Sequence, residues 1–328
     1  MSHRRPPRVP PPMQALVAAT VLLGAAPESV PGQELLTAGD VVAMEAPAPD
    51  FVISYGEGAL HYGHLRLPDG PGPHPVVIFI HGGCWLSAYG IGHVGSLENG
   101  LANEGYAVWS LEYRRVGDEG GGWPGTFLDV GRGVDHLRVL AAEHALDLDR
   151  VVVSGHSAGG HLALWVASRR KLQYDQELYS VDPLPVHGVL GLAPAPDLEA
   201  LHDAGACGNV VDGLMGGSPV AVPERYAQAS PMQLAPVPAP QTLVVGALDR
   251  AWGPAGRAYY RRALEVGDDE VTLVEAPESG HFEMIVPGTS TWPLVLEAYR
   301  ELFARIEGVP SRRPVPPREP LFGSGDTR

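Results

Sequence analysis

The stretch GHSAGGH at residues 155–161 carries the most structural information in the chain. It follows a β-rich run and precedes a helix-forming run. Gly155 and Gly159 flank Ser157 in the pattern G-x-S-x-G, and a sharp strand-to-helix turn brings neighbouring backbones too close for a Cβ at both glycines. A serine in that turn lies at a helix N-terminus, where positive potential favours a developing oxyanion. The motif predicts a nucleophilic Ser157; the alternative is a packing turn in which Ser157 only caps the helix.

On both sides of this turn, buried-strand patterns alternate with helical patterns. Residues 51–67 alternate as a hairpin of entry strands. The alternation predicts an α/β fold, with a mostly parallel central sheet and helices on both faces. The strands are expected at 76–80, 107–111, 151–154, 186–192, 242–246 and 271–275, and the helices at 97–105, 127–144, 161–170 and 293–306.

The 328 residues suit one α/β domain with short additions at both ends. The periodicity breaks down in the middle of the second half, which predicts a small cap over the carboxyl edge of the sheet. The Pro-rich and Arg-rich C-terminal tail is expected to be disordered. The predicted boundaries are a leader at 1–32, a linker at 33–50, the domain at 51–307 with its cap at about 194–240, and the tail at 308–328.

The N-terminal leader has the pattern of a secretory signal peptide. Arg4, Arg5 and Arg8 precede a short apolar run at residues 15–26, and small residues follow it. The run is too short to span a bilayer comfortably, so no stable membrane insertion is expected after its removal. Export to the periplasm or the medium is predicted; the alternative is a disordered leader on a cytoplasmic protein. The sequence leaves the cleavage site open.

Charge and cysteine content exclude several classes of protein. A formal net charge of −15 argues against a nucleic-acid partner, because phosphate binding needs clustered Lys and Arg. Cys84 and Cys207 are too few for a disulfide framework or a zinc cluster. A single bridge can form in an oxidising compartment, but no feature of the sequence places the two cysteines close together, so unpaired cysteines are favoured. No H-E-x-x-H or comparable spacing predicts a metal site.

A serine hydroxyl is a weak nucleophile and needs a base. In strand-turn-helix hydrolases the chain order is Ser, acid, His. His281 lies in a loop just after the last predicted strand, from which a side chain can reach the carboxyl edge of the sheet. It is therefore the expected base, in preference to the other histidines that follow Ser157, which are His161, His187 and His202.

The expected acid is Asp249, which follows the strand at 242–246. Its predicted work is to orient the imidazole and to stabilise the imidazolium. The competing carboxylates lie in a predicted turn or in the body of a strand, and they are Asp268, Asp269 and Glu275.

A second motif follows the first buried strand. In His81-Gly82-Gly83-Cys84, the glycines let backbone N–H groups face a substrate. The N–H groups of Gly83 and Cys84 on one side, and of Ala158 on the other, are the predicted oxyanion hole. His81 is expected to tie the loop to a neighbouring strand. A plain glycine turn is the alternative.

Together, HGGCW, GHSAGGH, the Asp249 segment and SGHFE resemble the α/β-hydrolase superfamily over roughly residues 50–306. HGG-x-W and GHSAGGHLA resemble its esterase and arylformamidase branch more closely. The resemblance implies serine hydrolysis through an acyl-enzyme without a cofactor, and it implies a structural Asp129 in the segment WPGTFLDV. Cys84 departs from the aromatic or glycine residue usual in these motifs. Trp85 and His156 are further candidates to line or support the pocket.

The sequence therefore predicts a serine hydrolase that cleaves small carboxylic esters. The same residues would serve an arylformamidase, another amidase or a peptidase, so the bond cleaved stays open. A non-catalytic hydrolase-like binding protein is the rival of another class. The natural substrate and the oligomeric state are not predicted.

Overall fold

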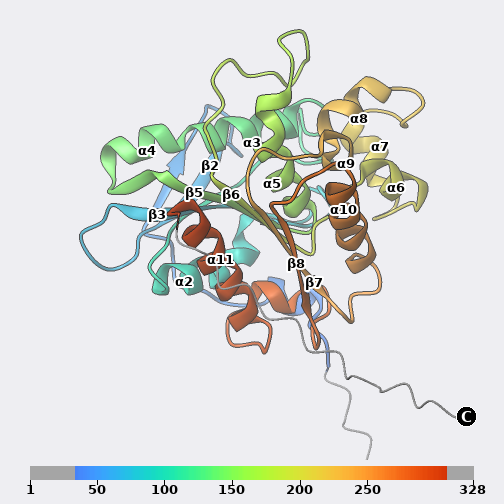
Figure 1. Ribbon diagram of the computed structural model, residues 1–328. Coiled ribbons are helices and arrows are strands. Elements are labelled where there is room, and N and C mark those ends of the chain that lie inside the picture. The colour runs from blue at the N-terminus through green and yellow to red at the C-terminus, as the bar shows by residue number, and fades with distance from the viewer. Residues whose placement is uncertain (1–33, 309–328) are drawn as a thin grey trace, which may run out of the picture. The chain divides into compact units, whose positions relative to one another are not determined.

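An eight-stranded sheet runs through the part of the chain that the computed structural model describes, residues 34–308 (Figure 1). The strand order is β1-β2-β4-β3-β5-β6-β7-β8. β1 and β2 pair antiparallel, β2 is antiparallel to β4, and all the other pairs are parallel. The strands are β1 (Phe51–Ser54), β2 (Tyr62–Arg66), β3 (His74–Ile80), β4 (Ala107–Leu111), β5 (Leu146–His156), β6 (Gly188–Leu192), β7 (Gln241–Gly246) and β8 (Val271–Ala276).

The helices alternate with the parallel strands along the chain, as in a doubly wound fold. The predicted helix at 127–144 is present but is interrupted at His136, which gives α3 and α4. No helix within residues 34–308 is long and apolar enough to cross a membrane. The helices outside the cap are α1 (Ala38–Val42), α2 (Gly95–Asn103), α3 (Gly125–Asp135), α4 (Leu137–Glu143), α5 (Ala158–Ser168), α10 (Gly253–Glu265) and α11 (Trp292–Ile306), with 3-10 turns η1 (Ile91–Val94), η2 (Arg169–Lys171) and η3 (Glu283–Ile285).

Both faces of the sheet are covered, which explains its continuous apolar strands. Successive side chains of a strand point to opposite faces. In β3, Ile78 packs into the core beneath α3, α4, α5 and α10, whereas Phe79 packs into the core beneath α2 and α11 (Figure 1). A strand buried on both sides favours apolar residues throughout, and all of β4 and β6 is buried, with Ser110 of β4 as the one polar residue in these two strands.

The segment between β6 and β7 is helical, where the sequence predicts a small cap at 194–240. Four short helices occupy it: α6 (Leu198–Asp203), α7 (Val210–Met215), α8 (Pro223–Ala229) and α9 (Pro231–Leu234). Asp197 caps α6 by accepting the N–H of Ala200. Proline opens both α8 and α9, because its missing N–H costs nothing in a first turn.

The prediction of a linker at 33–50 is wrong. The part of this segment that the structure describes is folded onto the domain. Residues 38–42 form α1, and Thr37 and Asp40 form a capping box in which each side chain accepts the other's backbone N–H. Val41 of α1 is buried against the turn η1. The predicted leader at 1–32 and the predicted tail beyond Gly308 lie outside the described residues.

Candidate active site

Ser157 lies between β5 and α5 in a strained conformation. Its φ of +55° and ψ of −117° lie in a region that residues other than glycine rarely adopt. Such a conformation costs about 1–3 kcal/mol. A Cβ at Gly155 would lie 2.2 Å from the carbonyl oxygen of Gly159, and a Cβ at Gly159 would lie 2.0 Å from that of Ile80. The turn therefore needs both glycines, and it places Ser157 at the carboxyl edge of the sheet.

Asp249 and His281 meet at the same edge, although 32 residues separate them. Asp249 follows β7, and its Oδ2 accepts a hydrogen bond of 2.7 Å from His281 Nδ1. Its Oδ1 accepts the N–H groups of Ala251 and Trp252. Burial alone would raise the pKa of Asp249, but the hydrogen bond and charge of His281 and these two N–H groups lower it below its usual value. The carboxylate is thus ionised, and both of its oxygens accept hydrogen bonds.

Backbone contacts hold the Asp249 and His281 loops together. Leu248 donates its N–H to the carbonyl of Ser279 at 3.0 Å. A Cβ at Gly246 would lie 2.1 Å from the carbonyl oxygen of Gly280, so the end of β7 must be glycine for the two loops to approach. The position of the imidazole is therefore set by the fold as well as by its carboxylate partner.

Ser157 and His281 both line one cavity of about 160 Å³. Within the described residues no hydrogen bond joins Ser157 Oγ to His281, and such contacts are often long before a substrate binds. Apolar surface dominates the wall. The other lining residues are Ala38, Val41, Val42, Gly83, Cys84, Tyr89, His93, His156, Trp252 and Phe282.

The predicted oxyanion loop borders the same cavity. Gly83, Cys84 and Trp85 all have positive φ, of 108°, 54° and 54°. Among the contacts of the described residues, the N–H groups of Gly83 and Cys84 have no hydrogen-bond acceptor. Ala158 is the first residue of α5, so its N–H is one of the donors that a helix start leaves free. This loop and this helix start can together supply donors to an oxyanion.

His81 joins the predicted oxyanion loop to the residue that follows β4. Its Nε2 lies 3.0 Å from Oε1 of Glu112, the residue after β4. Burial alone would raise the pKa of Glu112, but His81, the N–H of Ile91 and the charge of Arg115 lower it to about 2. An ionised, buried carboxylate thus holds the base of the loop in place.

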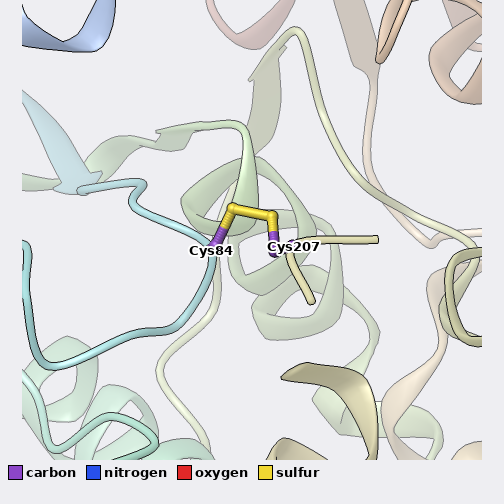
Figure 2. The surroundings of a disulfide bond; sticks show 2 residues. All are labelled: Cys84 and Cys207. Carbon is purple, nitrogen blue, oxygen red and sulfur yellow. A yellow bond between two sulfur atoms is a disulfide. The ribbon is translucent and has the colours of Figure 1, made fainter. Parts of the chain in front are cut away.

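A disulfide joins Cys84 to Cys207 (Figure 2), so the expectation of unpaired cysteines is wrong. Cys207 lies between α6 and α7, and the bond links the oxyanion loop to the cap across 123 residues. Sequence spacing could not show this contact, because it arises only when the cap folds back over the end of β3.

His156 contacts the loop that carries His281. Its Nε2–H donates to the carbonyl oxygen of His281 at 2.8 Å, and the two ring centroids are 4.6 Å apart. Burial and the neighbouring His281 lower the pKa of His156 well below its usual value, so its imidazole is neutral. His93 is a second neutral histidine in the wall, since burial and the charge of His81 lower its pKa to about 4.

The two remaining candidates lie outside the cavity wall. Trp85 is buried in the core, and its Nε1–H donates to His161 Nδ1 at 3.2 Å. Asp129 of α3 is fully buried and pairs with Arg114 at 2.7 Å and with His61 at 2.9 Å. Both residues therefore stabilise the scaffold. Within residues 34–308, no three His, Cys, Asp or Glu side chains gather in a way that could hold a metal ion.

Sequence reasoning missed several residues of the wall. α1 contributes Ala38, Val41 and Val42, and its signal was the capping-box pattern Thr37-x-x-Asp40. Trp252 and Phe282 neighbour Asp249 and His281 along the chain, so they follow from those two predictions.

Comparisons with known proteins agree with this architecture. The BD-FAE family model matches residues 65–251, more than half of the chain. Esterase LipC of Mycobacterium tuberculosis is 29% identical over 231 residues, which cover 67% of this chain and 56% of LipC. The probable carboxylic ester hydrolase LipM of the same organism is 34% identical over 120 residues, 35% of this chain and 27% of LipM. The chain thus spans about half of LipC and less of LipM.

Solved structures share the fold. A structure of esterase B from Lactobacillus rhamnosis, inhibited by a tributyrin phosphonate, has a TM-score of 0.66 at 22% identity and covers 80% of this chain and 88% of its own. The propionate-bound esterase Est2 of Thermogutta terrifontis has a TM-score of 0.62 at 19% identity and covers 79% and 95%. With the sheet, the turn at Ser157 and the family match all in agreement, the chain belongs to the BD-FAE family and has the α/β-hydrolase fold.

Proposed function

We propose that the protein is a serine hydrolase that cleaves small carboxylic esters through an acyl-enzyme. The observation that carries the proposal is one cavity bordered by a strained Ser157 and by His281, whose other ring nitrogen bonds Asp249. Support also comes from the names of LipC and LipM, an esterase and a probable carboxylic ester hydrolase.

In the proposed first step, Ser157 Oγ attacks the ester carbonyl carbon and its proton passes to His281 Nε2. Asp249 keeps Nδ1–H of His281 bonded, so that Nε2 is the free acceptor, and its charge stabilises the imidazolium. The carbonyl oxygen becomes an oxyanion, which the N–H groups of Gly83, Cys84 and Ala158 would bind. Each such donor is typically worth about 3 kcal/mol in the transition state.

The tetrahedral intermediate then collapses. The bond to the alcohol oxygen breaks, and the alcohol leaves with the proton from His281. A water molecule next gives a proton to His281 and attacks the acyl carbon of the ester on Ser157. Return of that proton to Ser157 Oγ releases the carboxylic acid and restores the enzyme. Every proton in the cycle thus passes through the same nitrogen.

A small substrate fits the cavity. Its volume of about 160 Å³ lies below the ~300–1,000 Å³ usual for ligand sites, and its wall is mostly apolar. This supports a short acyl or alcohol group. The same machinery could act on an aryl formamide or another amide, so the experiment must compare the bonds directly.

The test is turnover on a matched panel by wild type and Ser157→Ala. The panel holds p-nitrophenyl esters from acetate to laurate, N-formylkynurenine, an acetylated sugar and a prolyl anilide. A Ser157-dependent preference for short esters would support the proposal. A preference for the formamide would move the assignment to an arylformamidase, and a folded protein inactive on the whole panel would favour a binding protein. Full activity of Ser157→Ala would remove Ser157 as the nucleophile.

We also propose that the protein is exported. Support comes from the basic and apolar pattern at Arg4–Ala26 and from the Cys84–Cys207 disulfide, because such bonds persist mainly in oxidising compartments. Mass spectrometry of the native protein should find an N-terminus near residues 27–33 and no free thiol. An intact Met1 on protein in the cytoplasmic fraction would contradict export.

A further inference from the structure

We propose that residues 35–48, the N-terminal strap, are a built part of the substrate pocket, and that Val42 and Val41 limit the size of the apolar group that the pocket accepts. The inference rests on the proposed ester hydrolysis. The strap contains α1, which contributes Ala38, Val41 and Val42 to the cavity that also contains Ser157 and His281. Among the described residues, none from the predicted cap at 194–240 lines this cavity. The strap, and not the predicted cap, therefore contributes this part of the cavity wall.

α1 presents two valines to the cavity in different ways. Val41 is 2% exposed and packs with Ile91 and Val94 of η1, so its position is fixed by the core. Val42 also lines the cavity but is 56% exposed, which places it where the cavity meets solvent. A side chain at position 42 can therefore change size without disturbing the core.

A buried carboxylate holds the start of the strap. Glu283 is 1% exposed; its Oε1 accepts the N–H of Leu36 at 2.6 Å and its Oε2 accepts the N–H of Gly280 at 2.8 Å. Gly280 immediately precedes His281, and a Cβ there would lie 3.1 Å from Leu35 Cδ1. One side chain thus fixes the strap relative to the loop that carries the proposed base.

A buried guanidinium holds the other end. Arg66 is 5% exposed and donates to the carbonyl oxygens of Pro47 and Ala48, while its Nε donates to the fully buried Glu98 at 3.1 Å. Burying ions is costly unless their hydrogen bonds are satisfied. Two buried charged groups, 217 positions apart in the chain (Arg66 and Glu283), thus each bond main-chain atoms of the strap, which is what a fixed wall requires.

The surroundings define the chemistry of the group that the strap meets. Trp252 and Phe282 line the cavity with the strap valines, and apolar surface exceeds polar surface in the wall. The accepted group is therefore a short hydrocarbon. It belongs either to the acyl part or to the alcohol part of the ester, and two substrate series separate these cases.

The experiment uses the full chain and the variants Val42→Phe, Val42→Ala and Val41→Ala. One series varies the acyl chain of p-nitrophenyl esters from two to eight carbons; the other varies the alkyl alcohol of acetate esters over the same range. In each series, kcat/KM for the longest accepted ester is divided by kcat/KM for the shortest. Val42→Phe should lower this ratio about tenfold, the effect of one methylene in a tight pocket. The alanine variants should move the cutoff to longer chains.

Val52→Phe is the matched control, because Val52 is 63% exposed on the edge strand β1 and lies outside the cavity wall. It should keep the wild-type profile in both series. The series in which the Val42 variants shift the cutoff identifies the group that meets the strap. Active Val42 and Val41 variants with the wild-type profile in both series would overturn the inference while leaving the proposed function intact. A wild type that hydrolyses neither series would overturn the proposed function itself.

Discussion

His281 Nδ1 and Asp249 Oδ2 lie 2.7 Å apart at the carboxyl ends of β8 and β7. The other carboxylate oxygen is held by the N–H groups of Ala251 and Trp252, so the acid cannot rotate away from the imidazole. This pairing fixes which nitrogen of His281 carries the proton and directs the other nitrogen to the cavity.

Asp249→Asn should therefore lower kcat by about 10⁴-fold with little change in KM, because an amide N–H in place of Oδ2 favours the wrong tautomer of His281. Steady-state kinetics on the best ester of the panel would measure this. Asp203→Asn, in the exposed end of α6, is the matched control and should behave as wild type. A kcat within tenfold of wild type for Asp249→Asn would exclude Asp249 as the orienting acid.

His156→Phe should lower kcat about tenfold, since it removes the donor that holds the His281 carbonyl while keeping a ring of similar size. The loss of one hydrogen bond to a partly buried carbonyl is worth about 1–3 kcal/mol. His156→Gln retains an N–H donor and should recover part of the rate. Equal kcat for both variants, at equal thermal stability, would show that this hydrogen bond does not position the base.

The sequence predicted those parts of the candidate site whose residues are required by the local backbone. The turn at Ser157 sterically requires glycine at 155 and 159, and the neighbouring loop requires glycine at 82 and 83 for the same kind of reason. Parallel strands bring their carboxyl ends to one edge, so residues that follow β5, β7 and β8 had to lie near one another. The approach of the Asp249 and His281 loops thus follows from the parallel sheet, whereas their 2.7 Å contact also depends on the close packing of the two loops at Gly246.

The features that the sequence did not predict depend on contacts between segments that lie far apart along the chain. α1 has only five residues, too few for a helical period to show, and the hydrogen bond that joins Leu36 of the strap to Glu283 spans 247 residues. The disulfide has no local pattern either, because its two cysteines lie in loops that meet only in the folded chain. α10 was overlooked although its start, Gly253-Pro254, has proline in the first turn of a helix.

Cys207→Ala should lower the free energy of unfolding by about 2–5 kcal/mol, because the bond closes a loop of more than a hundred residues in the unfolded chain. Chemical denaturation with and without reductant would measure the loss. The wild type should lose stability in reductant, whereas the variant should not respond. If wild type and variant unfold at the same denaturant concentration, the bond between the oxyanion loop and the cap is not a stabilising element.

His161→Gln should flatten the dependence of stability on acid pH. His161 Nε2–H donates to Ala229 and its Nδ1 accepts from Trp85, so the folded protein needs the neutral ring. Burial lowers its pKa to about 4, against a usual value of 6.5. Between these values the unfolded chain binds a proton that the folded chain does not, so stability present above pH 6.5 is lost as the pH falls to 4.

One such group contributes a slope of about 1.4 kcal/mol per pH unit in that window. Unfolding free energies of wild type and His161→Gln, measured in denaturant from pH 4 to 8, should differ in slope by about this amount below pH 6.5. Above pH 7 the two slopes should agree, which is an internal control, while the variant is less stable overall because Trp85 and Ala229 lose well-placed partners. Parallel curves through the whole acid range would show that the ring of His161 takes up its proton without unfolding the protein.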